Sequence, residues 1–123
     1  MLEKFLNGFI LFCFIAIIVD VALSHIKTHF NKNAMWIPII TIPSIIVSET
    51  IYLFNDSLVI KYFVIISLFI NLLIGLLGSY FHYKAGAFRD MSFMKKLIFG
   101  PPVLAALQIS ALAFLGIIFA IFL

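Results

Sequence analysis

Four long apolar stretches fill most of this chain, at residues 5–23, 36–54, 58–80 and 101–122. Hydrophobic residues make up 65% of the sequence and charged residues only 11%, so a water-soluble fold of this length would expose extensive apolar surface. A helix of about 20 apolar residues crosses a bilayer core of roughly 30 Å. We therefore expect residues 1–123 to form a single integral membrane domain with four spans.

The apolar stretches favour helices over strands because they are nearly continuous. Strands of a membrane barrel would show shorter segments in which apolar and polar residues alternate. A helix also satisfies its backbone hydrogen bonds internally, as hydrocarbon requires. The sequence thus predicts an all-α fold, a four-helix transmembrane bundle.

The segment between the third and fourth stretches has the pattern of a helix on the membrane surface. Apolar side chains recur at helical spacing and charged side chains fall between them: Phe88, Met91, Met94 and Ile98 among Arg89, Asp90, Lys95 and Lys96. We expect a short amphipathic helix over residues 88–98 that lies in the interface. Gly100 would end it, and Pro101 and Pro102 would begin the last span, where proline costs no internal hydrogen bond.

Basic residues are distributed unevenly between the two sides of the predicted bundle. Lys4 and Lys61 flank one side. The first and third connections, on the other side, contain Lys27, Lys32, Lys84, Arg89, Lys95 and Lys96. The positive-inside rule places these connections in the cytoplasm and both termini outside. No basic tract is long enough to follow a phosphate backbone, so the sequence argues against a nucleic-acid partner.

Two carboxylates, Asp20 and Glu49, interrupt the apolar stretches. Charge in hydrocarbon costs on the order of 3 kcal/mol, so both are expected to face the bundle interior or a wet pocket. The other intramembrane polar candidates are Asn71, near the middle of the third span, and Gln108, about two turns into the fourth. Asn7 lies at a depth similar to that of Glu49.

These carboxylates have two open interpretations. Glu49 could form a structural ion pair with Lys61 across the short second connection. Candidate partners of Asp20 are His25, His82, Lys84 and Arg89. Alternatively, the two acids could bind protons at successive depths, as intramembrane carboxylates do in proton-coupled carriers. Pro43 supports this alternative, because it predicts a bend in the second span and bent spans often border cavities.

Small residues spaced four apart mark the last two spans. They are Gly75 and Ser79 in the third span, and Ala106, Ser110, Gly116 and Ala120 in the fourth. This spacing lets helix backbones approach each other closely, which favours association in lipid. We expect these two helices to pack on each other or on a partner subunit.

Histidines near the cytoplasmic side form a candidate metal site. His25 and His29 lie one turn apart if the first helix continues past Ser24, so both imidazoles could face one ligand. With His82 and Asp20 they would form a set suited to zinc, copper or iron. The alternative is that they are solvated at the interface. No motif for a nucleophile, a dinucleotide or a phosphate is present, so the sequence assigns no catalytic residue and no cofactor.

Three short motifs resemble those of a group of proteins. They are the stretch from His29 to Pro38 (HFNKNAMWIP), Phe81-His82-Tyr83, and Gly100-Pro101-Pro102. The chain resembles uncharacterised small bacterial membrane proteins with a similar Met-aromatic-x-Pro turn and Gly-Pro-Pro entry to the last span. The resemblance implies a four-span protein of the bacterial inner membrane and implies no activity.

The sequence leaves three hypotheses for the function. The first is a structural or accessory subunit of a homo-oligomer or larger membrane complex, suggested by the small-residue faces. The second is a proton-coupled carrier of a small solute that uses Glu49 or Asp20. The third is a membrane enzyme that binds a metal or redox cofactor through His25, His29 and His82.

Overall fold

The computed structural model describes residues 2–27, 33–84, 92, 94 and 103–122, and the regular elements in them are helical. The elements in chain order are α1 (Leu2–Lys27), the short 3-10 helix η1 (Asn33–Trp36), α2 (Ile37–Phe54), α3 (Leu58–Tyr83) and α5 (Val103–Phe122). The predicted all-α fold is confirmed.

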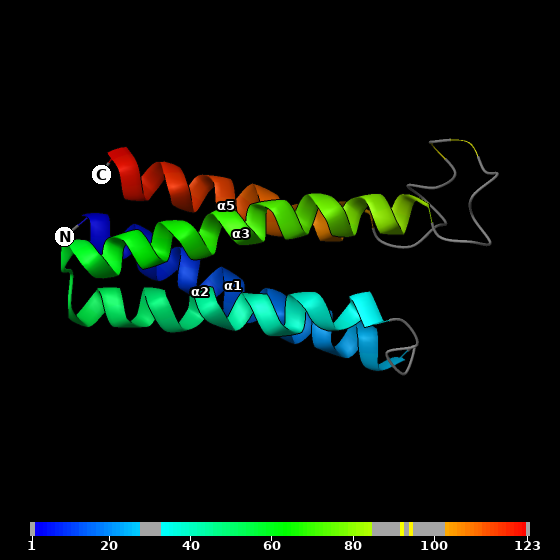
Figure 1. The fold of residues 1–123 in the computed structure, drawn as a ribbon, viewed down its shortest axis with the longest axis horizontal. Helices are drawn as coiled ribbons and strands as arrows, with labels where there is room; N and C mark the ends of the chain where they lie inside the picture. Colours follow the sequence, from blue (N-terminus) through cyan, green and yellow to red (C-terminus); the bar gives the residue numbers. More distant parts are fainter. Residues whose placement is uncertain (1, 28–32, 85–91, 93, 95–102, 123) are drawn as a thin grey trace.

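The four α-helices lie along one long axis and form two hairpins, α1 with α2 and α3 with α5 (Figure 1). Helix α2 also packs on α3, and α1 on α5, so the contacts close into a ring. Because successive helices are antiparallel, the two termini lie at the same end of the bundle (Figure 1). We call this the terminal end; it holds the start of α1, the end of α2, the start of α3 and the end of α5.

The outside of the bundle is apolar. Helices α1, α2 and α3 are long and apolar enough to cross a membrane, and the apolar segment of the last helix, Ala106–Phe122, is shorter. Large side chains point outward along the helices, with Phe12 70% and Phe54 89% exposed. Water would not tolerate so much exposed hydrocarbon, whereas lipid matches it. The chain is therefore a membrane protein.

The helix ends differ in detail from the predicted spans. Helix α1 continues to Lys27 and α3 to Tyr83, because a helix does not have to stop where its apolar stretch ends. Helix α3 begins after Ser57, whose hydroxyl oxygen accepts a hydrogen bond from the Ile60 backbone N–H at 3.3 Å. Apart from residues 92 and 94, the predicted interfacial helix at 88–98 lies outside the described residues, as does the Gly-Pro-Pro motif.

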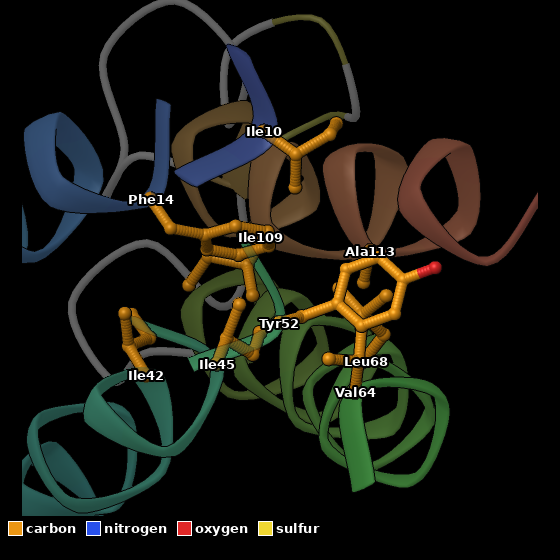
Figure 2. Close-up of a cluster of buried hydrophobic side chains, with 9 residues drawn as sticks. All are labelled: Ile10, Phe14, Ile42, Ile45, Tyr52, Val64, Leu68, Ile109 and Ala113. Atoms are coloured by element: carbon orange, nitrogen blue, oxygen red, sulfur yellow. The ribbon is translucent and has the colours of Figure 1, made fainter. Parts of the chain in front are cut away.

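The apolar core lies in the middle of the ring and takes residues from all four helices (Figure 2). Its members are Ile10, Phe14, Ile42, Ile45, Tyr52, Val64, Leu68, Ile109 and Ala113. On α2 the buried positions are Ile42, Ile45, Ser48, Glu49 and Tyr52, a spacing that follows one face of a helix. Glu49 therefore points toward the interior because it shares the face of the core isoleucines.

Helices α3 and α5 approach closely at their small residues. A Cβ atom built on Gly75 would lie 2.2 Å from Ser110 Oγ and 2.7 Å from Ser110 N, so only glycine fits there. The Ser110 hydroxyl donates across the interface to the Leu72 carbonyl at 2.7 Å. Ser79, Ala106 and Ala120 are also buried.

Gly116 faces two neighbouring helices. A Cβ atom there would meet Leu68 of α3 at 3.1 Å and Ile10 of α1 at 3.5 Å. The small residues of the last two spans thus face other helices of the same chain. They are covered within one molecule and provide no free surface for a second copy.

Candidate functional site

Glu49 is the most unusual residue of the bundle interior. Its side chain is 0% exposed, and neither carboxylate oxygen has a hydrogen-bond partner among the described residues. The expected ion pair with Lys61 is therefore absent. Lys61 is half-buried near the start of α3, where a long side chain can keep its ammonium group in water instead of carrying it inward.

Asn7 of α1 is the buried polar residue at the level of Glu49. The register follows from the next turn outward, where the Tyr52 hydroxyl of α2 donates a hydrogen bond to Glu3 Oε1 of α1. Asn7 lies one turn inward from Glu3, and Glu49 lies one turn inward from Tyr52. Asn7 is 1% exposed and its Nδ2 has no partner in the described part of the chain.

These four residues form what we call the carboxyl site: Glu3, Asn7, Glu49 and Tyr52. Its inner level, Asn7 and Glu49, offers an amide N–H donor and two carboxylate oxygens without partners. Its outer level, Glu3 and Tyr52, is already hydrogen-bonded. Buried polar groups normally have partners, so an unpartnered carboxyl and an unpartnered amide at one level of the bundle indicate a place that takes up something else, such as a proton or a small cation.

A second polar level lies about one turn into α2 and near the middle of α3. Asn71 is 0% exposed, and its Nδ2 donates to the Ser67 carbonyl at 2.9 Å and the Thr41 carbonyl at 3.2 Å. Asn71 Oδ1 and Thr41 Oγ1 are buried without partners among the described residues. Thr41 is eight residues before Glu49, roughly 12 Å along the helix, and core residues such as Ile42 and Ile45 fill the space between (Figure 2).

Asp20 does not face the bundle interior, which is one of the two placements expected for it. Its side chain is exposed. The inward face of α1 runs through Asn7, Ile10 and Phe14, and Ile17 continues it toward the core. Position 20 falls outside this stripe and lies next to Val19, which is 53% exposed. Helix α1 is apolar on all sides, so the sequence alone did not reveal which side packs inward.

The remaining sequence candidates lie apart from the carboxyl site. Gln108 is exposed on α5. His25 lies on α1, and its Nδ1 is 2.9 Å from the Met35 carbonyl oxygen, which ties the end of α1 to η1. His82 is half-buried in the last turn of α3, and His29 lies outside the described residues. Within the described ranges no group of three metal-binding side chains is assembled.

No protein-family model, curated protein or solved structure matches this chain. The sequence had pointed to Glu49 and to the depth of Asn7, but it missed Glu3 and Tyr52. Their spacing of one turn from Asn7 and Glu49 was a usable signal, because the two ends of an antiparallel hairpin meet in register.

Proposed function

We propose that this protein is a small proton-coupled carrier with Glu49 as its proton-binding group. The observation that carries the proposal is the complete burial of Glu49 with both carboxylate oxygens unpartnered in the described part of the chain. A permanently ionised carboxylate would be costly there. A carboxyl group that is neutral while it holds a proton avoids this cost for part of the time, and can therefore serve as a proton-binding group. Intramembrane ionisable residues commonly mark proton or substrate paths.

The same proposal includes the membrane and the orientation. We propose four spans in a bacterial cytoplasmic membrane, with both termini outside, and membership of the small bacterial group that the short motifs resemble. The support is the excess of Lys and Arg in the first and third connections and the position of both termini at one end (Figure 1). The terminal end, with the carboxyl site near it, then faces away from the cytoplasm.

Helix α2 offers a means of movement. Pro43 lies inside α2 and has no backbone N–H, so the helix lacks one internal hydrogen bond at this point. Pro43 lies between the half of α2 that carries Glu49 and the half that carries Thr41. A carrier alternates between two conformations, and the two halves of α2 could differ in relative orientation between them. A proline is a common place for a helix to bend.

A transport assay in vesicles tests the proposal. The purified full chain is reconstituted with a pH-sensitive dye inside, an acid-outside gradient is imposed, and amino acids, amines and inorganic cations are added in turn. We expect one solute class to accelerate the collapse of the gradient, and Glu49→Gln to abolish that acceleration. Asp20→Asn is the matched control, because it removes an outward-facing carboxylate of equal charge and should leave the flux unchanged.

An unchanged flux in Glu49→Gln would contradict the proposal. If no solute in the panel accelerates the collapse, the carrier activity is not supported for these classes, and the protonation of Glu49 can still be measured directly.

A second candidate function is a subunit of a homo-oligomer or larger complex, favoured by the exposure of Asp20. An outward carboxylate between the exposed Val19 and Leu23 is poorly matched to lipid, so a neighbouring protein would be a better cover. Native mass measurement after mild extraction tests this. A stable monomer in both the wild type and Asp20→Asn would rule it out, whereas an assembly lost in Asp20→Asn would support it.

A further inference from the structure

We infer that protons reach Glu49 from the terminal end of the bundle, through Glu3 and Tyr52, given the proton binding at Glu49 proposed above. The path has three residues in order of depth. Glu3 is half-buried in the first turn of α1, Tyr52 is 6% exposed in the last turn of α2, and Glu49 is fully buried one turn farther in.

The first contact of the path is formed. The Tyr52 hydroxyl donates its hydrogen bond to Glu3 Oε1, which connects the buried phenol to a carboxylate at the end of the bundle. Tyr52 also lies three residues after Glu49 on the same buried face of α2. Tyr52 is therefore the polar group between the outer carboxylate and the inner one.

The titratable groups near Glu49 can be named helix by helix. Helix α1 contributes Glu3 and the exposed Lys4, and α2 contributes Tyr52. The α2–α3 connection contributes the exposed Asp56, and α3 contributes the half-buried Lys61. Helix α5 has no titratable side chain. Among these residues only Tyr52 is itself buried and can pass a proton inward.

Apolar side chains block the approach to Glu49 from the end of the bundle opposite the terminal end. Ile10, Phe14, Ile45 and Leu68 are core residues that are each 0% exposed (Figure 2). Each lies farther along its helix from the terminal end than Glu49 does along α2. The next polar level, at Thr41 and Asn71, lies beyond them. A proton that moved to Glu49 from that side would cross this apolar layer, in which the buried hydroxyl of Ser48 already donates to the Ile45 carbonyl at 3.2 Å, and such a crossing is strongly unfavourable.

The transfer balances with the groups present. A proton from water binds the Glu3 carboxylate. Once Glu3 is protonated, the Tyr52 hydroxyl rotates about its C–O bond so that its O–H points toward Glu49. Glu3 then gives its proton to the Tyr52 hydroxyl oxygen while the original Tyr52 hydroxyl proton passes to a Glu49 oxygen. One O–H bond breaks at Glu3 and one forms at Glu49, and Tyr52 ends with a single O–H bond as it began.

Infrared spectroscopy with labelled glutamate can follow this path, because Glu3 and Glu49 are the only two glutamates of the chain. The full chain with carbon-13 carboxyl glutamate is placed in lipid nanodiscs and acidified rapidly, and the carbonyl band of each protonated carboxyl group is recorded over time. Glu49→Gln and Glu3→Gln assign the two bands.

We expect the Glu3 band to appear before the Glu49 band. Tyr52→Phe keeps the ring but removes the hydroxyl, and should slow protonation of Glu49 about a hundredfold with the same final amplitude. Glu3→Gln should slow it as well. Tyr62→Phe is the matched control, because Tyr62 is 57% exposed on α3, away from the path, and should keep the wild-type rate.

The experiment distinguishes failure of the proposed proton path from failure of the proposed proton binding at Glu49. If Glu49 protonates at the wild-type rate in Tyr52→Phe or in Glu3→Gln, the path is wrong although Glu49 still binds a proton. If no Glu49 band changes with pH in the wild type, the proposed proton binding fails, and the path fails with it. Helix content by circular dichroism confirms that each variant is folded.

Discussion

Gly75→Ala should destabilise the bundle strongly although it adds a single methyl group. The new Cβ would lie 2.2 Å from Ser110 Oγ, 2.7 Å from Ser110 N and 3.1 Å from the Ala106 carbonyl oxygen. The Ser110 hydroxyl could rotate away, but its hydrogen bond to the Leu72 carbonyl would then be lost. The backbone nitrogen cannot move unless α3 and α5 separate.

The expected loss of stability combines two costs, overpacking and a lost hydrogen bond, and one opposing gain in helix preference. Overpacking of this kind costs about 1–3 kcal/mol, and a lost hydrogen bond costs about 1 kcal/mol. Alanine is also a better helix former than glycine by up to about 1 kcal/mol, which acts in the opposite direction. Gly78→Ala isolates the clash, because it has the same change in helix preference and its Cβ would meet only Ala106 Cβ at an ordinary 3.7 Å.

We therefore expect the free energy of unfolding of Gly75→Ala to be about 3 kcal/mol below that of Gly78→Ala. Reversible unfolding in mixed lipid and detergent micelles, followed by circular dichroism as the denaturing detergent is raised, measures this difference. Equal stability of the two variants would refute the close approach of α3 and α5 at Gly75. It would also refute the statement that the small residues of these helices are covered by other helices of the same chain.

Further predictions concern the core and the polar levels. Leu68→Ala should lower the free energy of unfolding by about 2–5 kcal/mol because it opens a cavity at a fully buried position, whereas Ile66→Ala, at a side chain 56% exposed, should change it by less than about 1 kcal/mol in the same unfolding assay. Asn71→Ala should cost about 1 kcal/mol through the loss of its bonds to the Thr41 and Ser67 carbonyls, and a variant as stable as the wild type would show that these bonds contribute nothing. Gly8→Ala should not destabilise the protein, because an added Cβ meets nothing within 4 Å, and a clear loss of stability would place a neighbour at that surface.

The helices could be predicted from the sequence because their length is set by the bilayer. An apolar run of about 20 residues has one way to satisfy its backbone in hydrocarbon, so residues 36–54 closely predicted Ile37–Phe54. The helix ends at Lys27 and Tyr83 were harder, because nothing in lipid forces a helix to stop where polar residues begin.

The direction in which each side chain points, into the bundle or outward, could not be predicted in the same way. Soluble helices reveal their inner face through alternating polarity, but a helix that is apolar on all sides carries little of this signal. The sequence therefore could not show that Asp20 is exposed, or that the oxygens of Glu49 have no partner in the described residues, Lys61 included. Only the structure shows how α1 and α2 align along the bundle axis. This alignment places Asn7 and Glu49 at the same buried level.

The central claim is that Glu49 gains and loses a proton inside the bundle. An equilibrium infrared titration of the carbon-13 glutamate protein in lipid vesicles tests it most directly. We expect a protonated carbonyl band that disappears reversibly as the pH is raised, persists in Glu3→Gln and is absent from Glu49→Gln. A wild-type spectrum in which the Glu49 carboxyl stays in one protonation state across the pH range in which the protein is folded would contradict the account.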